Sequence, residues 1–334
     1  MYTLGIETSC DETAVAVVEN GTTVRSSCVS SSVNMHRKFG GIIPEIASRY
    51  HLEYINDVAA QALREASLRL DDIGLIAVTS HPGLMGSLLV GVSFAKALSF
   101  GRGIPLIGVN HLHAHLFAPF LNQRGYTFPF IGLVVSGGHT SLAYVSAVDR
   151  IRIIGQTRDD AAGEAYDKVA KLLELGYPGG PVVDRLAGAT ALSPFRFNCG
   201  RIKDSLDFSF SGIKTDVMYR CRALGHTSKT VKAQICRAFQ EEVVAVLVEK
   251  SLAACRQFNV NRLSVGGGVT CNSSLRQRLQ LACREHGITL LLSEPRFCID
   301  NAAMIASLGY HLFRRGKRSP LTLTPAASAR PRRR

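Results

Sequence analysis

The chain has 334 residues, a hydrophobic fraction of 46%, a charged fraction of 19% and a net charge of +13, the values of a globular protein long enough for two domains. No apolar run reaches the roughly 18 residues of a membrane span, and the first residues lack the basic and long apolar regions of a signal peptide. We therefore expect a cytoplasmic protein without a membrane segment. The nine cysteines include no CxxC pair, which argues against a disulfide framework and a cysteine-based zinc module.

Positive charge is concentrated at the C-terminal end of the chain. Residues 314–334 contain eight Lys or Arg and no acid, and the last five residues are RPRRR. Such a composition, with Ser, Thr, Pro and Ala before it, is typical of a disordered basic segment. We expect residues 317–334 to be a disordered tail, which either solubilises the protein or meets a polyanion such as RNA.

The first half of the chain begins with three predicted strands. Apolar alternation predicts strands at residues 2–8, 13–18 and 22–30, with Asn20-Gly21 as the hairpin turn between the last two. A helix is predicted for residues 44–66, with a proline in its first turn. A strand at 73–79, a helix at 84–100 and a strand at 105–109 follow.

The second half repeats this order. Strands are predicted at residues 130–135, 140–145 and 151–156, and helical patterns cover residues 161–175 and 231–258. After them we expect a strand at 262–265, a helix at 272–286, a strand at 288–292 and a helix at 301–314. The predicted domains are residues 1–122 and residues 123–316, the second with helical insertions.

The two halves also align in sequence. Residues 4–18, LGIETSCDETAVAVV, match residues 131–145, IGLVVSGGHTSLAYV, without gaps, and Gly, Ser, Thr and Ala coincide. Each half has the order of three strands, helix, strand, helix, strand, helix. The predicted fold is therefore α/β and actin-like, with duplicated ribonuclease-H-like domains facing a central cleft, as in sugar kinases, acetate kinases and the heat-shock chaperone ATPase. Such an analogy does not determine function.

Three turns carry residues suited to a ligand. Ser136-Gly137-Gly138 would let the backbone approach phosphate oxygens. At the matching turn of the first half, Asp11 and Glu12 could hold a metal, accept a proton or position a nucleophile, or else form a solvated turn.

The third turn is a run of three glycines that ends a predicted strand. Residues 266–268 would make room for a base or ribose, and Asn272 would be an early helix residue whose side chain meets the ligand. The alternative interpretation is a glycine-rich helix cap.

Three histidines occupy alternate positions in residues 111–115, HLHAH. On a strand all three would face one way, whereas on a helix His111 and His115 share a face and His113 points away. A pair four residues apart can bind one metal ion if a further ligand comes from elsewhere, and otherwise its rings cap or pack. Asp300 precedes the last predicted helix, where it could be the N-cap or that further ligand.

From Leu4 to Arg314 the chain resembles the bacterial TsaD proteins, also called the YgjD or Gcp family. The resemblance rests on GIETSCDET (5–13), GGIIPEIASR (40–49), VNHLHAH (109–115), VSGGHT (135–140), DDAAGEAYDK (159–168), YPGGP (177–181), LDFSFSGIKT (206–215) and GGGV (266–269). The Arg-rich tail is outside it.

The resemblance implies a tRNA N6-adenosine threonylcarbamoyltransferase. Such an enzyme moves the threonylcarbamoyl group of threonylcarbamoyl-AMP to the adenosine 3′-adjacent to the anticodon, at position 37, in tRNAs that read codons beginning with A. The implied partners are tRNA and the proteins TsaB and TsaE, acting in trans. The implied cofactor is one divalent metal ion, expected to be Fe2+, with zinc as the alternative.

The resemblance also implies roles for individual residues. The metal ligands would be His111, His115 and Asp300. The substrate-binding residues would be Val134, Val135, Ser136, Gly137, Gly138, Asp167, Gly180, Asp184 and Asn272. From the chemistry alone, Asp11 or Glu12 would be the catalytic carboxylate that orients the incoming amine or accepts its proton. Candidate contacts to tRNA phosphates are His36, Arg37, Lys38, Arg49, Arg196, Arg201 and Lys203.

Three other functions compete with this interpretation. The predicted fold also fits an actin-like ATPase or a sugar kinase. A metalloprotease would need HExxH, but Leu112 stands where the glutamate should be. The net charge alone would fit an RNA-binding module without enzyme activity.

Overall fold

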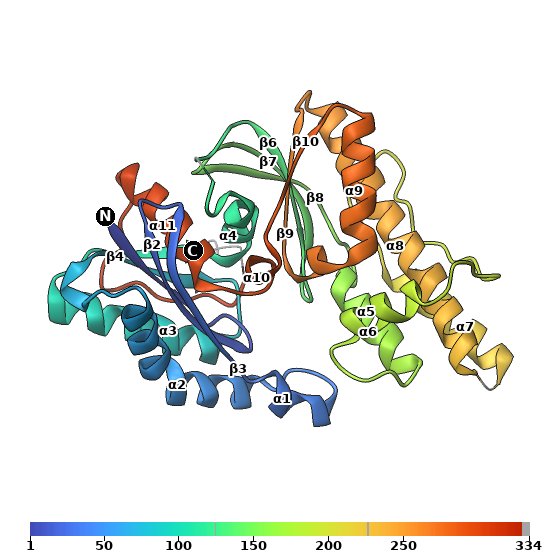
Figure 1. Cartoon of the computed structure of the whole chain (residues 1–334), viewed down its shortest axis with the longest axis horizontal. Helices are drawn as coiled ribbons and strands as arrows, with labels where there is room; N and C mark the ends of the chain where they lie inside the picture. Colours follow the sequence, from blue (N-terminus) through green and yellow to red (C-terminus); the bar gives the residue numbers. More distant parts are fainter. Residues whose placement is uncertain (124, 226, 329–334) are drawn as a thin grey trace. The chain divides into compact units, whose positions relative to one another are not determined.

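The structure, a computed structural model, describes residues 1–123, 125–225 and 227–328. The chain forms two compact units, one of Met1–Tyr126 with Arg296–Arg334 and one of Thr127–Pro295 (Figure 1). Each unit is built on one five-stranded sheet, with the strand order β3-β2-β1-β4-β5 in the first and β10-β9-β6-β7-β8 in the second.

The sheet of the first unit is mixed. Its strands are β1 (Tyr2–Glu7), β2 (Glu12–Glu19), β3 (Thr23–Ser31), β4 (Ile73–His81) and β5 (Leu106–Asn110). β1, β2 and β3 pair antiparallel, and β1, β4 and β5 pair parallel. The helices are α1 (Val33–His36), α2 (Pro44–Glu65), α3 (Met85–Arg102), α4 (His111–Phe117), α10 (Pro295–Cys298, which begins at the boundary) and α11 (Ala302–Arg314), with the short helices η1 (Arg37–Phe39), η2 (Leu70–Asp72) and η3 (Ala118–Phe120). The predicted hairpin turn is present, since Asn20 and Gly21 have φ values of 51° and 75°.

Helices cover both faces of this sheet (Figure 1). Val15 and Val17 of β2 pack with Ile55 of α2 and Val92 of α3, whereas Ala14 and Ala16 pack with Ala302 and Ala306 of α11. The alternation follows from strand geometry, because successive side chains point to opposite faces. The α11 face is lined by small residues, so this helix approaches the sheet closely.

The second unit repeats the same strand connections. Its strands are β6 (Phe130–Val135), β7 (Thr140–Ala147), β8 (Arg150–Gln156), β9 (Arg262–Gly266) and β10 (Thr289–Leu292). β6, β7 and β8 are antiparallel, and β6, β9 and β10 are parallel. The helices are α5 (Ala162–Leu172), α6 (Gly179–Gly188), α7 (Ser211–Leu224), α8 (Lys229–Gln257) and α9 (Ser273–Glu285), with the short helix η4 (Gly268–Cys271).

Two predictions about domain organisation differ from the structure. The helix at the end of the predicted second domain, α11, belongs to the first unit, because its alanines complete the core above β1 and β2. The predicted disordered tail is bonded to the fold in its described part, residues 317–328, since Ser319 N–H donates to Leu106 O and Ala326 N–H donates to Ser80 O. The last six residues, 329–334, lie outside the described residues.

None of the helices formed by the described residues combines the length and hydropathy needed to cross a bilayer.

The close approach of α11 to the sheet yields a stability prediction. A Cβ atom on Gly5 of β1 would lie 2.1 Å from the backbone oxygen of Ala302, and no rotamer change relieves a clash with backbone. We expect Gly5→Ala to lower the free energy of unfolding by roughly 1–3 kcal/mol, the usual cost of overpacking, measured by urea denaturation.

The matched control is Gly101→Ala in α3, where an added Cβ would meet nothing within 4 Å. This substitution should raise stability by roughly 0.5–1 kcal/mol, because alanine has the higher helix propensity. Equal stabilities for Gly5→Ala and the native protein would contradict the packing described for α11.

Candidate functional site

The paired histidines lie on α4, which begins directly after β5. The Asn110 side chain caps this helix by accepting a hydrogen bond from the His113 N–H at 2.9 Å. Helical spacing then places His111 and His115 on one face, and their rings meet edge to face with centroids 4.7 Å apart. The helix prediction for these histidines is thus confirmed, and His113 is outside the cluster.

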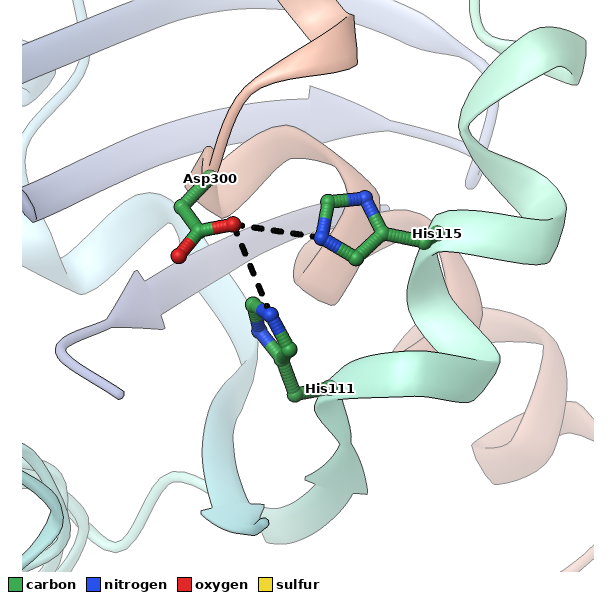
Figure 2. Close-up of side chains that lie close together, drawn as sticks. All are labelled: His111, His115 and Asp300. Carbon is green, nitrogen blue, oxygen red and sulfur yellow. Dashed lines mark hydrogen bonds and ion pairs between the residues drawn. The ribbon is translucent and has the colours of Figure 1, made fainter. Parts of the chain in front are cut away.

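The third member of the cluster, Asp300, comes from the turn before α11. Asn301, rather than Asp300, is the N-cap: its Oδ1 accepts from Met304 N–H, and its Nδ2 donates to the carbonyls of Phe297 and Ile299. Of the two roles considered for Asp300, the helix cap is therefore taken by Asn301. Its carboxylate instead faces α4 (Figure 2), 3.2 Å from His115 Nε2 and 3.4 Å from His111 Nε2.

These three residues, His111, His115 and Asp300, could hold a metal ion. One ligand atom from each lies within 4.8 Å of the other two, on buried or half-buried side chains. Two imidazoles and a carboxylate are a common ligand set for a divalent transition metal with open coordination positions.

A residue that the sequence analysis did not single out, Glu7, holds His111 in place. Glu7 ends β1 and is fully buried. Its Oε2 accepts from the His111 Nδ1 at 2.8 Å and from the Thr79 hydroxyl at 2.6 Å, and its Oε1 accepts from the Ser9 N–H at 2.5 Å. With Nδ1 engaged as a donor, the Nε2 atom of His111 is the one directed at Asp300, as in sites where a second carboxylate orients a metal-binding histidine.

Charges around His111 favour a cation at this point. Burial lowers the pKa of His111, but the carboxylates of Asp300 and Glu7 outweigh burial and raise this pKa to about 9. Burial raises the pKa of Glu7, whereas the charge and hydrogen bond of His111 lower it to below its ordinary value. A positive charge among these groups is therefore stabilised, which is the electrostatic condition that a metal site needs.

Asp11 and Glu12 lie near this cluster in the first unit. Glu12 begins β2, and its Oε1 accepts from the Ser31 hydroxyl at 3.2 Å. Burial first, and then the neighbouring charges of Asp11 and Asp300, raise the pKa of Glu12 to about 10. The Glu12 carboxyl is therefore protonated at neutral pH and is poorly suited to accept a proton.

The serine-glycine turn of the second unit is open. Val134 and Val135 are buried in β6, and Ser136 closes the turn by donating its N–H to His139 O at 2.8 Å. Gly137 and Gly138 are exposed, and a Cβ on either would meet no atom within 4 Å. A ligand can therefore approach this backbone closely.

The three-glycine turn lies beside it. Gly266 pairs with Val134, and a Cβ on Gly267, which has a φ of 97°, would lie 2.4 Å from Val135 O. Gly267 therefore allows β6 and this turn to touch, while Gly268 has open space. The structure thus brings the two glycine turns of the second unit together.

Asn272 does not have the predicted free side chain. It is the N-cap of α9, with its Oδ1 accepting from Leu275 N–H, and its Nδ2 donates to Gln240 Oε1 at 2.7 Å. Gln240, a buried residue that sequence reasoning missed, in turn donates to Asp184 at 3.0 Å. Asp184 also accepts from the N–H and hydroxyl of Ser273. Asn272 and Asp184 are therefore joined in one network around the start of α9.

Gly180 lies in the first turn of α6, and Asp167 of α5 contacts the start of that helix. Asp167 accepts from the Gly179 N–H at 2.7 Å, and burial raises the pKa of its carboxyl in spite of this bond and one from Gly180. A Cβ on Gly180 would meet no atom within 4 Å. The predicted substrate-binding residues of the second unit therefore lie at the end of β6, in the turn after it, in α5 and α6, or at the start of α9.

Of the predicted tRNA contacts, one is buried and two form ion pairs at the surface. His36 is buried and bonds to the Ser32 hydroxyl at 3.0 Å, so it is no surface contact. Arg49 pairs with Glu45 at 2.7 Å, and Arg201 pairs with Glu242 and Glu249.

Solved structures with the same fold have little sequence similarity to this chain. A full-length HypF in its phosphate- and nucleotide-bound form superposes with a TM-score of 0.62 at 14% identity, over 95% of this chain and 47% of HypF. Component A of the (R)-2-hydroxyglutaryl-CoA dehydratase of Acidaminococcus fermentans gives 0.55 at 14% identity, over 95% of this chain and all of that protein.

Relatives in sequence are far closer. The proteins named tRNA N6-adenosine threonylcarbamoyltransferase are 48% identical in Dictyoglomus turgidum (97% of both chains) and 50% identical in Thermodesulfovibrio yellowstonii (98% of this chain and 99% of that protein). The family model described as TsaD, tRNA N6-adenosine threonylcarbamoyltransferase, matches residues 23–307. The chain therefore belongs to the TsaD family.

Proposed function

We propose that this chain transfers the threonylcarbamoyl group from threonylcarbamoyl-AMP to the N6 amine of adenosine 37 in tRNAs that read codons beginning with A. The observation that carries the proposal is similarity over nearly the whole length to relatives with one shared activity in their names. The protease alternative has no support, because Leu112 replaces the glutamate that HExxH requires. The test is nucleoside mass spectrometry of tRNA incubated with the chain, its partner proteins and threonylcarbamoyl-AMP.

The glycine turns of the second unit are the proposed AMP-binding elements. The donor is a mixed carbamoyl–phosphate anhydride, so the enzyme mainly positions it and stabilises the charge that develops on AMP. The exposed backbone of Gly137 and Gly138 suits the phosphate, and the open side of Gly268 suits the nucleoside. The other proposed substrate-binding residues are Val134, Val135, Ser136, Asp167, Gly180, Asp184 and Asn272.

His111, His115 and Asp300 are the proposed metal ligands, and Fe2+ is the proposed ion. A bound divalent ion would supply Lewis-acid polarisation of an oxygen of the donor. The residues themselves fix where it binds: Glu7 holds the His111 ring through Nδ1, and Asn301 caps α11 so that Asp300 faces the histidines.

In the transfer, the N6 amine attacks the carbamoyl carbon, the bond from that carbon to the phosphate oxygen breaks, AMP leaves and the amine loses one proton. Asp11 is the proposed acceptor of that proton. Glu12 is the less suitable acceptor, because burial and the neighbouring acids raise its pKa to about 10. We assign Glu12 an orienting role as a hydrogen-bond donor.

The proposal extends to the fold and the partners of the chain. The two sheets, which share one strand order, would be the ribonuclease-H-like halves of an actin-like fold. The proposed partners are TsaB and TsaE, acting in trans on tRNA in the cytoplasm.

The metal site yields a prediction on metal affinity. We expect Asp300→Ala to abolish tight binding of Fe2+, and Glu7→Gln to weaken binding by roughly 10–100-fold, the usual effect of losing a residue that orients a ligand. Affinity is measured by competition with a chromophoric chelator under anaerobic conditions.

The control is His113→Ala, on the same helix but outside the cluster, which should bind the ion as the native protein does. If Glu7→Gln and His113→Ala had equal, native affinity, then Glu7 would have no part in orienting His111. If Asp300→Ala retained full affinity, the cluster would not be the metal site.

The two acids yield a second prediction. Asp11→Asn should lower the single-turnover rate of transfer by roughly 10²–10⁴-fold, the contribution of a general base. Glu12→Gln should lower it by less than roughly tenfold, because glutamine can replace a protonated carboxyl as a donor. The reverse order of the two rates would assign the proton to Glu12 instead.

A further inference from the structure

A buried histidine outside the candidate metal cluster, His51 of α2, bonds to the turn between β1 and β2. His51 has no solvent exposure. Its Nδ1 lies 2.7 Å from the Thr13 hydroxyl, and its Nε2 lies 2.9 Å from the backbone oxygen of Cys10. Both ring nitrogens are therefore engaged with the segment that carries Asp11 and Glu12.

These two partners determine which nitrogen of the His51 ring carries the proton. A carbonyl oxygen can only accept a hydrogen bond, so Nε2 is the protonated atom and donates to Cys10 O. The Thr13 hydroxyl then donates to the bare Nδ1. Burial lowers the pKa of His51, which favours this neutral ring over the charged form. His51 is thus a fixed donor to the turn.

The carbonyl groups on both sides of Cys10 are held as well. Ser9 O accepts from the N–H of Leu84, the N-cap of α3, at 2.8 Å. Asp11 O accepts from the N–H of Ser32, the N-cap of α1, at 3.0 Å and from its hydroxyl at 2.9 Å. Three consecutive carbonyls are thus bonded to three segments that are distant in the sequence, and the middle bond depends on the side chain at position 51.

Asp11, the proposed proton acceptor, follows Cys10 directly. Because a peptide bond is planar, holding Cys10 O fixes the plane of the peptide unit that enters Asp11, and holding Asp11 O fixes the plane of the unit that leaves it. Two fixed planes that meet at one Cα determine its φ and ψ, and with them the direction in which the side chain leaves the backbone. On the other side of Cys10, the Ser9 hydroxyl lies 3.2 Å from His111 Nδ1, so the turn also borders the candidate metal cluster.

We propose that His51 is a positioning residue for the transfer: its bond to Cys10 O holds the turn so that the Asp11 carboxylate meets the N6 amine. The inference rests on the proposed function, in which Asp11 takes the proton that the amine loses. His51 acts through Asp11 and is not itself a catalytic residue. A displacement of about 1 Å at a reacting group can cost roughly 10²-fold in rate, so the loss of one bond in the turn is enough for a measurable effect.

Two amide substitutions separate the two bonds of His51. In His51→Gln the amide nitrogen can take the place of Nε2 and donate to Cys10 O, whereas in His51→Asn the amide oxygen can take the place of Nδ1 and accept only from Thr13. We expect His51→Gln to keep the single-turnover rate of transfer within about threefold of the native rate, and His51→Asn to lower it by roughly 10–100-fold. The concentration of threonylcarbamoyl-AMP at half-saturation should stay native, because the proposed AMP-binding turns belong to the second unit.

Two further variants complete the set. His51→Leu keeps most of the volume but neither polar atom, so it should lower the rate as His51→Asn does, and it replaces that variant if His51→Asn does not fold. The matched control is His311→Gln in α11, a histidine of the same unit beside Gly21, at the other end of β2 from the turn. This substitution should lower the melting temperature and leave the transfer rate native.

A double-mutant cycle tests whether His51 acts through Asp11. If it does, adding His51→Asn to an Asp11→Asn chain should lower the residual rate by less than about threefold, because the group that His51 positions is already gone. A histidine with a purely structural role would lower the rate by the same factor in both backgrounds, and equal factors would overturn the inference.

Hydrogen–deuterium exchange of residues 9–13 gives a measurement that is independent of catalysis. Exchange in this segment should be faster than native in His51→Asn and close to native in His51→Gln, because only the first variant frees the turn to open. Unchanged exchange in His51→Asn, or equal losses of rate in His51→Asn and His51→Gln, would contradict the positioning role. Failure of the native chain to modify tRNA, together with the expected exchange, would instead overturn the proposed function.

Discussion

The hydrogen bond between Glu7 and His111 is the interaction on which the candidate metal centre depends. A carboxylate with no solvent exposure is costly unless its charge is matched, and here it accepts from three donors, in the turn after β1, in β4 and in α4. The same bond fixes which nitrogen of His111 points at Asp300. Strand order makes this possible, because β1 and β4 are neighbours and β5 leads directly into α4. Rigid packing of α11 on Gly5 completes the arrangement by holding the turn that carries Asp300.

The two units share one topology, on which we propose two kinds of chemistry. Both sheets have the same order and direction of strands, and the turn after the first strand is the point of divergence. In the first unit this turn carries Asp11 and Glu12, and the surrounding groups favour a cation. In the second unit it carries Gly137 and Gly138, whose exposed backbone suits an anion. The proposed division between a cation-binding and an anion-binding unit would follow from a few residues at the strand ends.

The sequence predicted the strands and most of the long helices to within a few residues, because hydrophobic periodicity reports local burial directly. It did not predict α6 and α7, which lie between the two helical patterns of the second half. It also identified the histidine pair, whereas the choice of Asp300 depended on the resemblance to a family. What it missed were partners distant in the chain: Glu7 lies 104 residues from His111, and nothing local marks it as a partner. Two differences concern helix caps. Asn272 was expected to have a free side chain but caps α9. Asp300 and Asn301 are adjacent and both good N-caps, and only the packing of α11 selects Asn301. Residues 317–328 are attached to the fold although disorder was predicted, because their composition is polar and their few contacts, such as that of Leu323, have no periodic pattern.

The central claim is that His111, His115 and Asp300 bind one metal ion through two imidazoles and a carboxylate. X-ray absorption spectroscopy of the full chain loaded with one equivalent of Fe2+ tests it most directly. We expect only nitrogen and oxygen neighbours, at about 2.0–2.2 Å as for comparable imidazole and carboxylate ligands, with outer-shell scattering from two imidazole rings. A sulfur neighbour at about 2.3 Å, which would implicate the nearby Cys10, or scattering from fewer than two imidazoles would contradict it.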